Sequence, residues 1–190
     1  MKKIIPFLFL LFFLGCDRGP IIEDFKIEGV GLGDSLLDIM TKDEISHQIS
    51  NPFVRYDSYS PPNLFYEFYT NNNLETYYEM SFFVYANDEK YKIYGIFGEL
   101  KHSTLDRCHS EQEKVTQDFK DMFPEAEYFD FSIYEHYSYK GSFTRENQFT
   151  MPNGEILMTQ CIDDRVGDYG GDKSLFISVA REELYDWLSQ

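Results

Sequence analysis

Hydrophobic and polar residues alternate along much of this chain, which predicts strands more often than helices. Between residues 53 and 100, apolar side chains recur at every second position, and proline, asparagine or aspartate separates the runs. Because the connections between runs are short, we expect an antiparallel meander. The predicted strands are residues 53–59, 64–70, 77–85, 91–100, 128–139, 141–149, 155–162 and 174–180.

One long segment has helical spacing instead. The helix begins after Ser103 or Thr104 and ends at Phe123-Pro124. Its apolar stripe should lie on one face of the sheet, with Cys108 directed toward the strands. The residues that form this stripe are Leu105, Cys108, Gln112, Val115, Phe119 and Met122.

Shorter helical segments are expected near both ends of the domain. Capping-box patterns that begin at Ser35 and Thr41 predict one short helix, a break near Thr41, and a second short helix. A closing helix over residues 182–188 has Leu184 and Trp187 as its anchors. The predicted fold is therefore α+β: an antiparallel sheet of about six to eight strands, one long helix packed on it, and a short N-terminal helical segment.

Glycines and aromatic residues add detail to the predicted sheet. Gly95 and Gly98 lie inside one strand, where glycine marks a bulge, a strong twist or a close neighbour. Phenylalanine and tyrosine stripes at strand spacing are expected to form the core and cross-strand pairs. A groove for a peptide or a glycan is the alternative interpretation of these stripes.

The first sixteen residues have the pattern of an export signal. Lys2 and Lys3 precede an apolar run of about eleven residues, roughly half the length of a membrane-spanning helix. The ending Phe13-Leu14-Gly15-Cys16 resembles the lipobox of bacterial lipoproteins, although Phe13 stands where that family prefers leucine. The resemblance implies that the leader is cut before Cys16 and that Cys16 carries acyl chains.

This resemblance sets the expected organisation and location. Residues 1–15 are the signal peptide, residues 16–24 a lipidated tether, and residues 25–190 a single globular domain. The domain is expected to face the periplasm, since two or three acyl chains anchor a protein firmly to a membrane. Asp17 resembles an inner-membrane retention signal, but that rule varies between bacteria, so the inner and outer membranes both stay open.

Charge narrows the range of partners. The formal net charge is −16, and removal of the leader with Lys2 and Lys3 leaves 15 basic and 33 acidic residues. Such a surface repels phosphate backbones, and no lysine or arginine cluster offsets it, so nucleic acid is excluded as a partner. The expected partners are the membrane, through the acyl chains on Cys16, and another envelope protein.

With Cys16 lipidated, Cys108 and Cys161 remain as a pair. In an exported bacterial protein this pair predicts one structural disulfide. A zinc site that also uses His102 and His109 is an alternative, but the spacing matches no usual zinc pattern. A nucleophilic cysteine is a further alternative, which His109 would have to assist from a different side of the helix.

An acidic, glycine-rich loop over residues 163–172 is the best candidate for a chemical site. Its carboxylates could bind a hard cation such as calcium, although the loop lacks the EF-hand pattern. The simpler interpretation is a solvated loop in which aspartate and glycine form turns. The candidate metal ligands are Asp163, Asp164, Asp168 and Asp172.

No catalytic motif is present in the chain. Gly29-x-Gly31 is followed by Asp34 where a dinucleotide-binding loop needs its third glycine, so this segment is expected to be a capped turn. Neither G-x-S-x-G nor H-E-x-x-H occurs. We therefore expect a non-enzymatic binding or envelope-assembly module without a cofactor. The alternative hypothesis is an envelope hydrolase that uses carboxylates of residues 163–172, with or without a metal ion.

Overall fold

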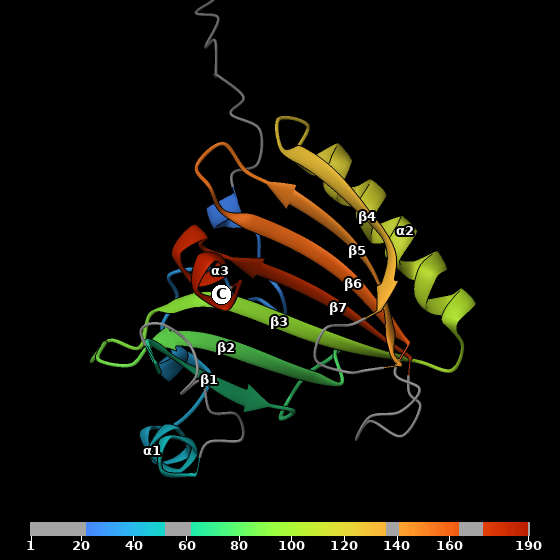
Figure 1. Cartoon of the computed structure of the whole chain (residues 1–190). Helices are drawn as coiled ribbons and strands as arrows, with labels where there is room; N and C mark the ends of the chain where they lie inside the picture. The colour runs from blue at the N-terminus through green and yellow to red at the C-terminus, as the bar shows by residue number, and fades with distance from the viewer. Residues whose placement is uncertain (1–21, 52–61, 136–140, 164–172, 190) are drawn as a thin grey trace, which may run out of the picture.

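Seven antiparallel strands form one sheet in the order β1-β2-β3-β7-β6-β5-β4 (Figure 1). The structure is a computed structural model that describes residues 22–51, 62–135, 141–163 and 173–189. The prediction of an antiparallel sheet is confirmed, whereas the strand expected at residues 53–59 lies outside the described residues. The strands are β1 (Phe65–Thr70), β2 (Glu79–Tyr85), β3 (Ile93–His102), β4 (Glu127–Glu135), β5 (Phe143–Thr150), β6 (Ile156–Asp163) and β7 (Lys173–Ala180).

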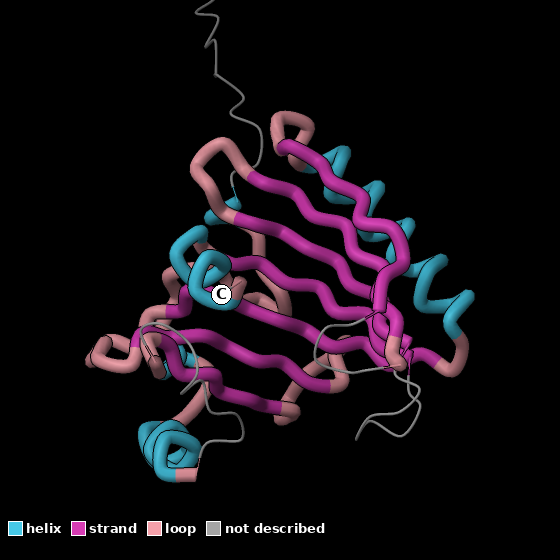
Figure 2. Tube along the Cα trace, in the orientation of Figure 1, coloured by secondary structure: helices cyan, strands magenta, loops and turns pink. Residues whose placement is uncertain are grey.

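The sheet consists of two meanders joined by a helix. Strands β1 to β3 follow one another along the chain, and α2 (Leu105–Met122) then carries the chain to the opposite edge of the sheet. Strands β4 to β7 return from that edge, so that β7 pairs with β3 in the centre (Figure 2). This β3–β7 pairing joins the two meanders into one sheet.

The helix α2 contacts β6, β7 and β3 on one face of the sheet. Its N-cap is Thr104, whose hydroxyl accepts a hydrogen bond from the backbone N–H of Arg107. The predicted disulfide is confirmed, because Cys108 of α2 is bonded to Cys161 of β6 with a Cα–Cα distance of 6.0 Å. The buried helix residues are Cys108, Gln112, Thr116 and Phe119, whereas Met122, which was expected to be buried, is 36% exposed.

The N-terminal segment folds as its capping signals predict. A three-residue 3₁₀ turn, η2 (Leu36–Asp38), precedes α1 (Lys42–Ser50). At the start of α1, Thr41 and Glu44 form the predicted capping box. Leu36 and Ile45 are fully buried and attach this segment to the main core.

A second, smaller core lies on the other face of the sheet. The short helix α3 (Glu182–Leu188) packs there through Leu184 and Trp187, and the strands contribute Phe65, Phe83 and Ala180. The two glycines of β3 have the close neighbours that their position predicted. A side chain at Gly95 would collide with Leu184, and one at Gly98 would collide with the ring of Tyr77.

Candidate functional site

The sheet face opposite α2 is the candidate binding surface. We call it the open face, because among the described helices α3 alone packs on it, at the end where the smaller core lies. The strand registers align open-face side chains in a row that crosses six strands, which we call the central row. Its members, from β4 to β2, are Phe131, Glu146, Gln160, Phe176, Glu99 and Glu79.

A neighbouring row runs parallel to the central row. It too combines polar groups with apolar and aromatic ones, so the mixed character extends across the face. Planar aromatic rings supply contact area, and amides and carboxylates supply directional hydrogen bonds, a combination that suits recognition. The members of this second row are Phe129, Gln148, Met158, Ser178, Phe97, Ser81 and Tyr69.

Glu146 lies at the centre of a hydrogen-bond network in the central row. Its Oε2 accepts a hydrogen bond from the Gln160 side-chain amide at 2.6 Å and another from the Tyr134 hydroxyl at 2.9 Å. Nearby, the Tyr185 hydroxyl of α3 donates to Oε1 of Gln148 at 2.9 Å. Neutral donors thus pair this buried carboxylate and amide, and the floor of the open face is polar.

A second carboxylate group lies on β2 and β3. Glu79 stands directly opposite Glu99, and the Ser174 hydroxyl donates a hydrogen bond of 2.5 Å to Glu99. Burial raises the pKa of Glu79, and the nearby Glu99 and Glu67 raise it further, while Lys101 opposes them. Acidic side chains of neighbouring strands therefore lie together at this end of the open face.

Because Glu79 and Glu99 lie opposite each other, replacing Glu79 with glutamine is expected to stabilise the fold. The folded-state pKa of Glu79 lies above its unfolded value, so its favourable contribution is complete below the unfolded pKa and is lost as the pH rises through the folded pKa. We expect Glu79→Gln to raise the free energy of unfolding at pH 7 by about 0.2–1 kcal/mol. The gain should shrink as the pH falls through the raised folded-state pKa and should be lost below the unfolded pKa of about 4.3.

Urea denaturation of parent and variant at pH 7 and pH 4 measures this effect. Glu127→Gln is the matched control, because Glu127 is exposed and faces Thr150 in the register. A Glu79→Gln protein that is less stable than the parent at pH 7 would show that Glu79 makes a favourable interaction instead.

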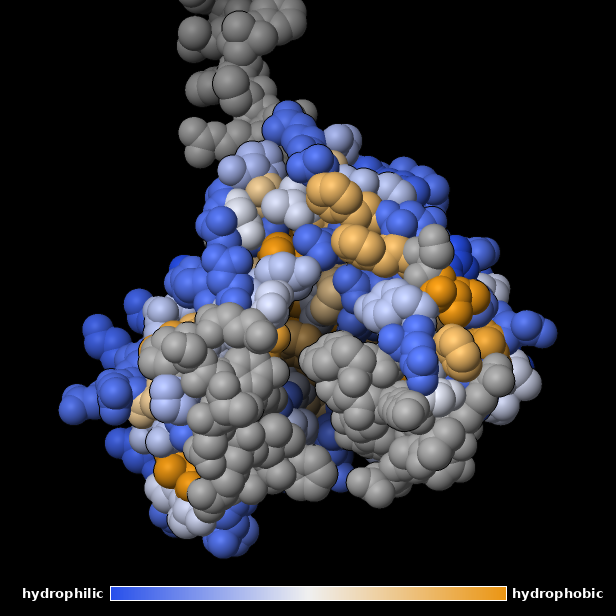
Figure 3. Space-filling model, viewed as in Figure 1, coloured by the Kyte–Doolittle hydropathy of each residue, from blue (hydrophilic) through white to orange (hydrophobic). Residues whose placement is uncertain are grey.

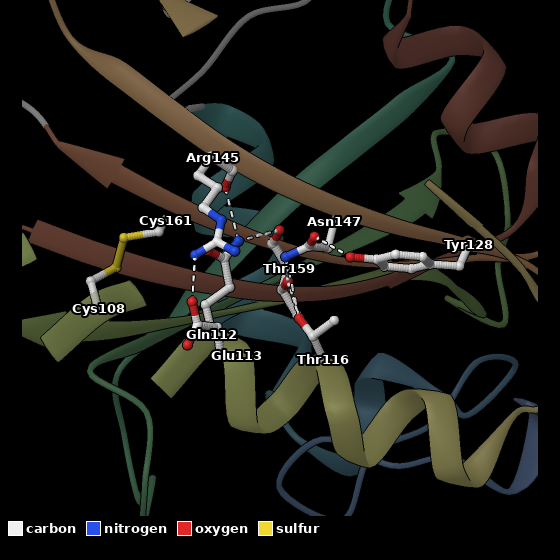
Figure 4. Close-up of polar contacts among 9 residues, drawn as sticks. All are labelled: Cys108, Gln112, Glu113, Thr116, Tyr128, Arg145, Asn147, Thr159 and Cys161. Carbon is white, nitrogen blue, oxygen red and sulfur yellow. Dashed lines mark hydrogen bonds and ion pairs between the residues drawn. A yellow bond between two sulfur atoms is a disulfide. The ribbon is translucent and has the colours of Figure 1, made fainter. Parts of the chain in front are cut away.

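A separate polar cluster lies under α2, on the covered face of the sheet (Figure 4). The Gln112 side-chain amide donates to the backbone carbonyls of Arg145 and Thr159, at 2.9 and 3.0 Å. Asn147 accepts a hydrogen bond from the Tyr128 hydroxyl and donates to Thr116. These contacts attach the helix to the sheet, so we assign this cluster a structural role.

The structure describes one of the four residues that were predicted as metal ligands. Asp163, at the end of β6, is buried and forms an ion pair with Lys173 of β7, with 2.6 Å between Oδ1 and Nζ. A lysine in this position competes with any cation for the carboxylate. Asp164, Asp168 and Asp172 lie outside the described residues.

The described residues do not support the zinc and thiol alternatives. The disulfide leaves neither Cys108 nor Cys161 as a ligand or nucleophile. In the described ranges, no group of three or more His, Cys, Asp or Glu side chains is arranged to hold a metal ion. His102 and His109 therefore have no metal-binding partners within that part of the chain.

The glycine-rich turn near the N-terminus has the capped form that was expected. Asp34 accepts a hydrogen bond from the backbone N–H of Gly31 at 2.9 Å and pairs with Lys26 at 3.1 Å. The Gly31 hydrogen bond and the Lys26 contact both lower the pKa of Asp34. A cavity of about 570 Å³ lies beside this turn, and the Glu28 carboxylate that lines it accepts a hydrogen bond from the backbone N–H of Thr76 at 2.7 Å. The charged groups named here already have partners within the protein.

Comparison with protein-family models, curated proteins and solved structures finds no match in any of the three. Within the described residues, no helix has the length and apolar character needed to cross a membrane. The described residues form a seven-stranded antiparallel sheet, with α2 and the N-terminal segment on one face and α3 at one end of the other. The two rows of the open face were not predicted from the sequence. The signal available for them was the alternation of Thr144, Glu146 and Gln148 along one strand.

Proposed function

We propose that this chain is a lipid-anchored protein of the bacterial envelope that acts as a non-enzymatic binding or assembly module. The observation that carries this proposal is the open face, where aromatic and hydrogen-bonding side chains are aligned in rows across the sheet. Phe129, Phe131 and Tyr134 remain 37–42% exposed at its β4 end. They give a ligand accessible aromatic contact area beside the polar floor.

The arrangement of the carboxylates favours recognition over catalysis. A general acid or base must exchange protons with a substrate within hydrogen-bond distance. Glu146 and Glu99 are both largely buried and already accept hydrogen bonds from Gln160 and Ser174. Groups held in this way orient the side chains beside them, and the exposed aromatic residues of β4 offer the contact area.

The anchor is tested by the mass of the protein extracted from bacterial membranes. We expect a chain of 175 residues that begins at Cys16, increased by the mass of two or three acyl chains. A chain with Cys16→Ala should carry no acyl mass and should not be labelled by a radioactive fatty acid. The parent protein recovered without acyl mass would contradict the lipid anchor.

The binding function is tested by loss of the envelope phenotype that the gene supports. We expect Phe131→Ser, on the open face, to reduce that phenotype while the protein stays folded and membrane-bound. Tyr78→Ser is the matched control, since Tyr78 is an exposed aromatic residue outside both rows. Equal loss of the phenotype in the two variants would show that the open face does not take part in the function.

A further inference from the structure

The described residues cover the two edges of the sheet differently. At the β1 edge, the Gln48 side chain of α1 donates to the backbone carbonyl of Tyr69 at 2.8 Å and accepts from the Tyr69 N–H at 2.9 Å. This amide takes the place of a neighbouring strand and satisfies an edge residue. Covering of this kind protects a sheet from unwanted strand pairing.

The β4 edge has no such cover within the described part of the chain. Alternate residues of an edge strand direct N–H and C=O groups outward, and no described segment pairs with the outer side of β4. Neither lysine, arginine nor proline occurs between Glu127 and Glu135. A register shift between Phe131 and Tyr134 interrupts the pairing with β5, so the regular portion of the edge is the first half of β4.

Exposed apolar side chains accompany this open edge. Figure 3 shows them as a band along β4. The rings of Phe129 and Phe131 are stacked, with centroids 6.2 Å apart, and Ile133 is 58% exposed. A cluster of exposed apolar residues of this kind marks an interaction surface more often than scattered ones do. We call this group the β4 patch: Phe129, Phe131, Ile133 and Tyr134.

Charge decides which partner suits the β4 patch. Glu127, Asp130 and Glu135 are all exposed, so the strand carries three carboxylates and no base. A second copy paired through β4 would set these carboxylates against one another, in a chain whose net charge is −16. Lys120, on the helix-covered side, is already placed over the ring of Tyr128. A basic partner is therefore favoured over self-association.

We propose that the outer edge of β4 binds an extended segment of a partner protein in which basic residues alternate with apolar ones. The segment adds an eighth strand through main-chain hydrogen bonds, and its apolar side chains contact Phe129 and Phe131. Its basic side chains alternate with these and face Asp130 on the α2 side of the sheet. This inference rests on the proposed function, since it names the class of partner that the module binds.

The test uses the full chain purified in a non-ionic detergent and a labelled seven-residue peptide that alternates lysine with valine and phenylalanine. We expect fluorescence anisotropy to show saturable binding, and hydrogen exchange to slow at β4 amides. A peptide with glutamate in place of lysine should bind at least about tenfold more weakly, as should one with a central proline. Detergent alone is the blank for both peptides.

Substitutions on β4 test whether the peptide binds at this edge of the sheet. We expect Phe131→Ser and Asp130→Lys each to weaken peptide binding about tenfold, equivalent to about 1.4 kcal/mol. Tyr78→Ser should leave binding within about twofold. Far-UV circular dichroism checks that each variant is folded. Because all three substituted side chains are exposed, each variant should keep the parent's unfolding midpoint.

Several results would overturn this proposal. They are absence of peptide binding, equal binding of the glutamate peptide, and exchange protection at strands other than β4. Concentration-dependent dimerisation that protects β4 without peptide would assign the edge to a second copy. Protection of the same amides by phosphatidylcholine nanodiscs alone would assign the patch to lipid. The acyl mass on Cys16 is unaffected by any of these results, so failure of the anchor and failure of the β4 site are distinguishable.

Discussion

Replacing Trp187 with alanine is expected to lower the free energy of unfolding by about 3–5 kcal/mol. Trp187 is 1% exposed, and its ring lies 5.4 Å from that of Phe65. Helix α3 has only seven residues, too few to be stable in isolation, so its position depends on this packing. The substitution removes the largest side chain of the smaller core and leaves a cavity between α3 and the sheet.

The measurement is urea denaturation followed by far-UV circular dichroism. Tryptophan fluorescence cannot serve, because Trp187 is the only tryptophan in the chain. The neighbouring, exposed Asp186 offers a control, and Asp186→Ala should change stability by less than about 0.5 kcal/mol. A loss below about 1 kcal/mol for Trp187→Ala would show that α3 contributes little to the fold.

Removal of the disulfide is expected to cost about 2–4 kcal/mol of stability. The bond links residues 53 positions apart, so it restricts the unfolded chain substantially. It also fixes the N-terminal part of α2 to β6, and both cysteines are fully buried or nearly so. Since α2 carries the chain from β3 to β4, loosening this helix should also loosen the placement of the β4 edge.

The double variant Cys108→Ala with Cys161→Ala should unfold at a lower guanidinium concentration than the parent. A reducing agent should lower the midpoint of the parent and leave that of the double variant unchanged. Electrophoresis without reductant gives an independent check that the parent contains the bond. A parent protein that is insensitive to reductant and has two free thiols by chemical labelling would contradict the predicted disulfide.

The local structure was largely readable from sequence because its causes are local. Alternation indicated the strands, and spacing near 3.6 residues together with Thr104 indicated α2. The capping box at Thr41 and the close neighbours of Gly98 were likewise predicted and confirmed. Cysteine pairing needed only the inference that the protein is exported and that Cys16 is occupied.

The candidate site was not readable in the same way. Glu146, Gln160 and Phe176 come from three different strands, and only the registers β5–β6 and β6–β7 make them neighbours. The opposition of Glu79 and Glu99 depends on the β2–β3 register in the same manner. A shift of one residue in either pairing would send these side chains to the other face.

The sequence by itself determined the types and approximate limits of the helices and strands, the acidic charge, and the residues available for a disulfide. Each of these follows from short-range patterns, local steric preference or composition. Only the tertiary structure decided that β7 pairs with β3, that α1 covers one edge through Gln48, and that β4 forms the other edge. These outcomes depend on packing between residues far apart in the chain, where many pairings satisfy the same alternation and the best burial of apolar surface selects one.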